Sequence, residues 1–110
     1  MISKFESAAR EWGAEVSIDH HRHYRAYSVD TGSEVVQIAQ RAAKTMGFSG
    51  DLRTTLGGSD ANIYNAKGVP CVVLGTGMEK IHTHDEFISR KDLIDTARLT
   101  YQIVLEAAKS

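Results

Sequence analysis

The chain has 110 residues, of which 42% are hydrophobic and 25% charged, and its formal net charge is −1. This balance provides no basic surface for nucleic acid or an anionic membrane, and no apolar run reaches the roughly 18 residues that a membrane span needs. A chain of this length is expected to form a single domain. The cytoplasm is the expected location, because charges interrupt the N-terminus where a signal peptide would be apolar, and because the lone Cys71 excludes an internal disulfide.

The first 29 residues predict a helix followed by one or two strands. Phe5, Ala8 and Trp12 lie on one face of a helix that Gly13 ends. Residues 16–18 then alternate apolar and polar side chains, which is typical of a half-exposed strand. A helix and strand with no partner strand indicate a chain cut from something larger.

From residue 31 onward, helices alternate with short strands. Thr31 and Glu34 fit a capping box that opens a helix ending at Gly47. Residues 52–56 alternate as a strand, and the continuously apolar run 69–74 favours a strand that is covered on both faces.

Two further helices are predicted from their N-caps. Ser59 or Asp60 can cap a short helix, and Ser89 with Asp92 fits the capping box of the last helix. The expected fold class is therefore α/β, a mixed sheet with flanking helices.

The loop after the apolar strand holds His82, His84, Asp85 and Glu86. Loops beyond the carboxyl ends of strands are where open α/β sheets bind ligands. Neutral imidazole is the commonest metal ligand, and a nearby carboxylate often fixes its tautomer. The residues alone leave two interpretations open, a metal site and an ordinary polar surface loop.

The turn at residues 57–62, with sequence GGSDAN, is the second candidate site. Backbone N–H groups at such a helix start can hold an anion, and two glycines let a ligand approach the main chain. The alternative is a tight turn with an N-cap. Both G-x-G-x-x-G and the Walker pattern are absent from the sequence, so a nucleotide motif is excluded.

The cluster of His20, His21 and His23 suggests transition-metal binding. However, His21 and His23 point to one side of a strand and His20 to the other. No cysteine or carboxylate ligand adjoins them in the expected geometry. A solvated strand face is the favoured interpretation.

The sequence GGSDANIYNAKGVP, followed by GTGMEKIHTHDEF, resembles the C-terminal part of the two-zinc exopeptidases. That family includes peptidase T, carboxypeptidase G and succinyl-diaminopimelate desuccinylase, and the likeness is greatest to peptidase T-like members. The resemblance implies that residues 1–29 end a lid domain and residues 30–110 form the C-terminal part of a catalytic domain. It also implies a homodimer formed through the lid domain.

The resemblance implies hydrolysis of small peptides, of the aminopeptidase or tripeptidase type, or of related amide bonds. Two zinc ions would form each complete active site, and His82 would supply one ligand. Gly58, Ser59 and Asn62 would face the peptide. From its position four residues after His82, Glu86 is a candidate to orient His82 or a neighbouring group, and an exposed salt bridge is the alternative for that carboxylate. His84 departs from the family pattern, in which many relatives carry a small polar residue.

The remaining family motifs, an HxD, a bridging aspartate and a Glu-Glu pair, are absent from this sequence. No catalytic residue is therefore assigned within the chain, which by itself is expected to be inactive. Two other classes stay open: a non-catalytic α/β module that binds an anion at the GGSDAN turn, and a structural subunit that dimerises through the exposed strand edge near residues 16–27.

Overall fold

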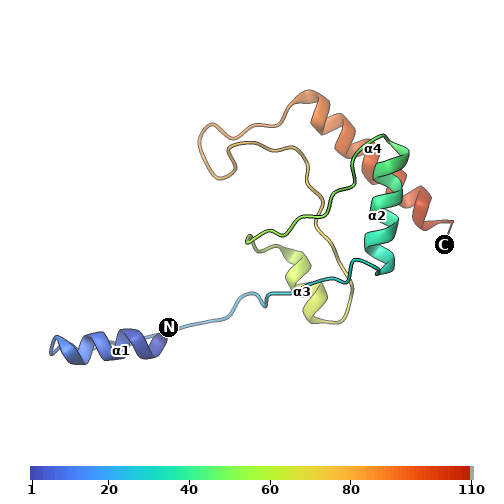
Figure 1. Cartoon of the computed structure of the whole chain (residues 1–110). Helices are drawn as coiled ribbons and strands as arrows, with labels where there is room; N and C mark the ends of the chain where they lie inside the picture. The colour runs from blue at the N-terminus through green and yellow to red at the C-terminus, as the bar shows by residue number, and fades with distance from the viewer. Residues whose placement is uncertain (110) are drawn as a thin grey trace.

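The structure of the chain is a computed structural model that describes residues 1–109. Four helices lie within this range (Figure 1). They are α1 (Ile2–Glu11), α2 (Glu34–Thr45), α3 (Asp60–Ala66) and α4 (Arg90–Ala107). None of them is long and apolar enough to cross a membrane.

The sequence predicted all four helices, and two of their caps are confirmed. Ser59 precedes α3, and the Ser89 hydroxyl accepts a hydrogen bond from the Asp92 N–H at 3.0 Å at the start of α4. The cap of α2 was predicted wrongly. Its N-cap is Ser33; Thr31 lies two residues earlier, and its carbonyl accepts a hydrogen bond from the Gln37 side chain.

The predicted mixed sheet is wrong. Across residues 1–109 the only β pairing is an isolated antiparallel bridge between Glu79 and Phe87. The predicted strands at 16–18, 52–56 and 69–74 are irregular chain. A strand exists only with a hydrogen-bonded neighbour, whereas alternating side chains report only which faces can be buried. These segments have suitable side chains and no neighbouring ladder.

A side chain takes the place of a ladder at residue 71. Asn65 of α3 donates to the Cys71 carbonyl at 2.7 Å and accepts from the Cys71 N–H at 3.2 Å. An amide side chain thus pairs with one residue's backbone as a strand would. This contact fixes the segment 69–74 beside α3.

Helices α2 and α4 pack against each other (Figure 1). Of the buried apolar residues in the described chain, most lie on α2. Val36, Ala42 and Ala43 are buried on α2, where alanine permits close approach of the partner helix. The segment 70–74 runs beside the pair and forms an apolar groove of about 330 Å³ with them. The groove is lined by Val35, Ile38, Ala39, Pro70, Cys71, Val72, Leu74, Ile103 and Ala107.

Glu106 joins the two helices by charge. The residue is 7% exposed, and its carboxylate accepts hydrogen bonds from Lys109 at 2.8 Å and Gln102 at 2.9 Å. The Arg41 guanidinium of α2 lies 3.9 Å away. The hydrogen bond from Lys109 is the main reason that the pKa of Glu106 is lowered, while partial burial opposes the shift.

Helix α1 lies apart from the other three, at the end of an extended segment (Figure 1). The molecule measures 63 × 36 × 18 Å, with a radius of gyration of 19.9 Å. A compact domain of this length would have about 13 Å. The boundary predicted near residue 29 between two domains stays a prediction.

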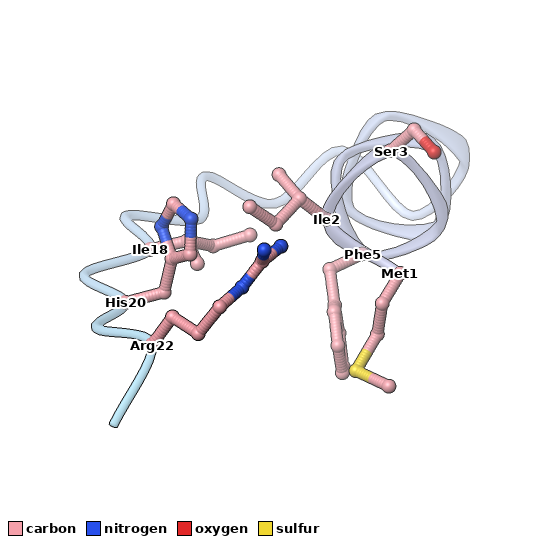
Figure 2. Close-up of a pocket in the computed structure, with 7 residues that line it drawn as sticks. All are labelled: Met1, Ile2, Ser3, Phe5, Ile18, His20 and Arg22. Carbon is pink, nitrogen blue, oxygen red and sulfur yellow. The ribbon is translucent and has the colours of Figure 1, made fainter. Parts of the chain in front are cut away.

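A shallow groove separates α1 from the chain that follows it (Figure 2). Ile18, His20 and Arg22 line one wall, and the other is formed by Met1, Ile2, Ser3 and Phe5. His21 lies outside this lining and pairs with Asp19 at 3.5 Å. The three clustered histidines therefore do not converge on one point.

Candidate functional site

The loop at residues 79–87 is closed at its base by main-chain hydrogen bonds. The Glu79 N–H donates to the Phe87 carbonyl at 2.9 Å, and the Phe87 N–H donates back at 3.2 Å. Inside the loop, the Thr83 hydroxyl donates to the Lys80 carbonyl at 2.7 Å. The loop is thus held by its own contacts, although most of it is exposed.

The base of this loop is anchored on α4. Gly77 has a φ of 80°, and a Cβ atom at that position would lie 2.9 Å from the Asp92 side chain. Glycine is needed here both for its conformation and for the close approach. The Thr96 hydroxyl also donates to the Thr76 carbonyl at 3.3 Å.

His82 lies at the tip of the loop in a left-handed backbone conformation, with a φ of 67°. This region costs a residue other than glycine about 1–2 kcal/mol. The Glu86 carboxylate accepts a hydrogen bond from the His82 N–H at 2.7 Å. Glu86 therefore contacts the main chain of His82 and not its imidazole.

The other polar residues of the loop form separate contacts. Asp85 pairs with Lys80, whose ammonium lies 3.7 Å from the carboxylate. Within residues 1–109, the Glu86 carboxylate forms no ion pair, and the hydrogen bond from the His82 N–H is its one polar contact there. The side chains of His82 and His84 are exposed and accept or donate no hydrogen bond in the described chain.

The GGSDAN turn opens α3, as predicted. Several of its main-chain donors are already engaged: the Gly57 N–H by the Thr55 hydroxyl at 3.2 Å, and the Ser59 N–H by the Asn62 side chain at 2.9 Å. The Asn62 N–H donates to the Ser59 carbonyl at 3.0 Å. The turn is therefore stabilised internally before any ligand is considered.

Asn62 also links the turn to the N-terminal segment. The residue is 8% exposed, and its side chain donates to the Arg25 carbonyl at 2.8 Å. Beside it, the ring of Tyr24 covers Gly58, where an added Cβ atom would lie 2.9 Å from the ring. Two of the three predicted substrate-binding residues thus also fasten the turn to residues 24–25.

The sequence does not reveal the structural roles of Tyr24 and Asn65. Tyr24 belongs to no motif, and its contact with Gly58 joins residues 34 positions apart. Asn65 left one signal, an amide residue on a short helix just before the apolar run 69–74, but nothing in that spacing specified the backbone of Cys71, six positions away, as its partner.

A zinc ion was predicted to bind His82, and the geometry fits a single ligand. The imidazole is exposed on a preformed loop, and neither ring nitrogen is engaged. However, no group of three His, Cys, Asp or Glu side chains that could hold a metal ion occurs between residues 1 and 109. His82 would therefore need partners supplied by other polypeptide.

A family model described as "Peptidase family M20/M25/M40" matches residues 4–106. The uncharacterized protein YqjE of Bacillus subtilis is 38% identical over 109 residues, which are 99% of this chain and 29% of that protein. Peptidase T of Bacillus licheniformis is 29% identical over 76 residues, covering 69% of this chain and 18% of that protein.

Two solved structures also resemble the chain. Aminopeptidase PepT from Bacillus cereus superposes with a TM-score of 0.80 and 36% identity, over 97% of this chain and 29% of its own. A tripeptidase from Staphylococcus aureus gives a TM-score of 0.89 and 34% identity, over 99% and 29% respectively. The chain spans less than a third of the length of these relatives.

Proposed function

The chain belongs to peptidase family M20/M25/M40, and from this premise we propose that it is the C-terminal part of a zinc-dependent exopeptidase that hydrolyses small peptides. The observation that supports this most is the match over residues 4–106 together with the closed loop that presents His82. The substrate class follows the relatives named peptidase T, aminopeptidase PepT and tripeptidase.

His82 supplies one ligand to a two-zinc centre in this proposal. Its exposed imidazole supports the assignment, and the other ligands come from the polypeptide that the relatives have beyond this segment. Bound zinc would polarise the scissile carbonyl and lower the pKa of an attacking water. The chain's own contribution is to hold an imidazole at the tip of a loop fastened to α4.

Gly58, Ser59 and Asn62 border the peptide in this proposal. Asn62 uses one of its two N–H donors on Arg25 and one lone pair on Ser59, so a second donor remains for a ligand. Gly58 presents main chain without a side chain, although the Tyr24 ring covers one side of it.

An anion-binding module is the weaker alternative. Several of the turn's N–H groups already donate within the chain, and α3 has only seven residues. A structural subunit loses the strand edge on which it was predicted, because residues 16–27 form no strand, but it keeps uncovered apolar side chains: Phe5 of α1 is 57% exposed, and Trp12, which follows α1, is 83% exposed. The same exposure supports homodimerisation of the complete enzyme through residues 1–29.

The proposed location is the cytoplasm. The one cysteine, Cys71, is a free thiol, and a lone reduced cysteine suits a reducing compartment.

The test replaces the matching segment of the Staphylococcus aureus tripeptidase with this chain and measures bound zinc and tripeptide hydrolysis. This chimera is chosen because that structure superposes with 99% of the chain. His82→Ala should lower the zinc content and abolish hydrolysis, because a metal ligand is lost. His84→Ala should leave the zinc content nearly unchanged.

The two histidines are matched controls, since they share one exposed loop and differ by two positions. Zinc lost with His84→Ala and retained with His82→Ala would show that the ligand is His84 and that the assignment to His82 is wrong. The 110-residue chain alone, supplied with Zn²⁺, should show no peptide turnover. Turnover that His82→Ala abolishes in the isolated chain would contradict the proposal that other polypeptide completes the site.

A further inference from the structure

We propose that Glu86 is a positioning residue that acts on His82 through the main chain and sets the metal-ligand loop before any metal binds. This inference rests on the proposed function, in which His82 is a zinc ligand. It differs from orientation of the ring by a carboxylate, because the Glu86 carboxylate accepts from the His82 N–H and leaves the imidazole unengaged.

The backbone at His82 adopts a left-handed conformation. A φ of 67° is disfavoured for a residue with a side chain, and Lys80, two positions earlier, has a φ of 51°. Two left-handed residues in one short loop need contacts that select them over extended chain. The Thr83 hydroxyl, at 2.7 Å from the Lys80 carbonyl, provides one such contact.

The hydrogen bond from the His82 N–H to the Glu86 carboxylate is a second such contact. At 2.7 Å it is short, and an ionised acceptor makes a hydrogen bond about twice as strong as a neutral one. The bond spans four residues across the tip of the loop. It therefore links residue 82 to the chain just before Phe87, where the Glu79–Phe87 bridge closes the loop.

The hydrogen bond to Glu86 leaves the His82 imidazole available for binding. A carboxylate bonded to the ring would occupy one imidazole nitrogen, whereas a bond to the main chain leaves both nitrogens accessible to a ligand. Asp85, the adjacent acid, pairs with Lys80 instead. The neighbouring carboxylates of Asp85 and Glu86 thus differ in role, so a substitution of Asp85 is the control for a substitution of Glu86.

The first experiment follows amide hydrogen exchange of the His82 N–H in the metal-free chimera by NMR, with selective labelling of histidine. Glu86→Ala should speed exchange at His82 about tenfold, since a charge-assisted bond is lost. Glu86→Gln should retain part of the protection because its carbonyl oxygen still accepts. Asp85→Ala should leave exchange at His82 unchanged. Equal exchange in the chimera and in its Glu86→Ala variant would overturn the proposal.

The second experiment titrates the metal-free chimera with Zn²⁺ alone and measures its affinity. Glu86→Ala should weaken zinc binding about 10–100-fold, as losses of orienting partners do, and Glu86→Gln should restore most of it. Unchanged affinity in Glu86→Ala would refute positioning and leave the proposed peptidase function standing. Unchanged zinc binding in His82→Ala would instead refute the metal assignment, independently of the exchange measurements.

Discussion

Because Gly58 has no side chain, the ring of Tyr24 can pack against it, and this contact joins two segments that are distant in the sequence. Gly58 has an ordinary backbone conformation, so glycine is required there for space rather than for a positive φ. The ring occupies the volume that a Cβ atom would fill. Beside it, Asn62 bonds the Arg25 carbonyl, so both contacts join residues 24–25 to the start of α3.

Gly58→Ala should therefore destabilise the chimera, by about 1–3 kcal/mol, because the Tyr24 ring must move. Gly57→Ala is the matched control, since a Cβ atom there lies an ordinary 3.6 Å from the Thr55 hydroxyl. Thermal denaturation of the two variants measures the difference. A Gly57→Ala variant as unstable as Gly58→Ala would show that loss of glycine, rather than the clash with Tyr24, is responsible.

Residue patterns predicted the helices well because their determinants are local. Ser89 caps α4 through Asp92, three positions away, and the apolar face of α2 repeats with the helical period. The prediction of a sheet failed because neither the alternation at residues 52–56 nor the apolar run at 69–74 carries information about a partner strand. At the site, the sequence indicated an exposed His82 loop, but the left-handed backbone and the Glu86 bond to it depend on three-dimensional closure.

Among the helices, α2 and α4 depend on each other most. Alanines of α2 allow close packing, and Glu106 of α4 faces Arg41 across the interface. The carboxylate is ionised when it accepts from Lys109 and Gln102. The charge state of one residue therefore affects the pairing of two helices.

Acid should weaken this pairing. The pKa of Glu106 is lowered in the folded chain, so its contribution to stability is present above the unfolded pKa of about 4.3 and is lost as pH falls through the lowered value. Circular dichroism of the chain between about pH 6 and pH 2 measures the helix content. Glu106→Gln should remove part of the decrease on acidification, and Glu11→Gln, on the exposed end of α1, should not. Identical acid profiles in the native chain and Glu106→Gln would contradict this role.

The whole molecule buries little apolar surface for its length. The buried apolar residues in the described chain are Val36, Ala42, Ala43 and Ala61, and no large side chain there is fully enclosed. Leu56, Trp12 and Tyr101 remain largely exposed. A radius of gyration of 19.9 Å is consistent with this open arrangement.

The isolated chain should therefore unfold over a broad temperature range or self-associate at micromolar concentration. Exposed apolar faces favour association, and a small core supports little cooperativity. Calorimetry and sedimentation velocity test both outcomes. A compact monomer with one sharp transition would show that the 110 residues form a self-sufficient domain.

The pairing of α2 with α4 also has a consequence for biosynthesis. When a ribosome finishes Thr45, the last residue of α4 is still about 60 residues away, which takes roughly 3–12 s at about 5–20 residues per second. During that interval α4 cannot cover the Val36 face of α2. The nascent helix thus presents an uncovered apolar face until α4 has been synthesised.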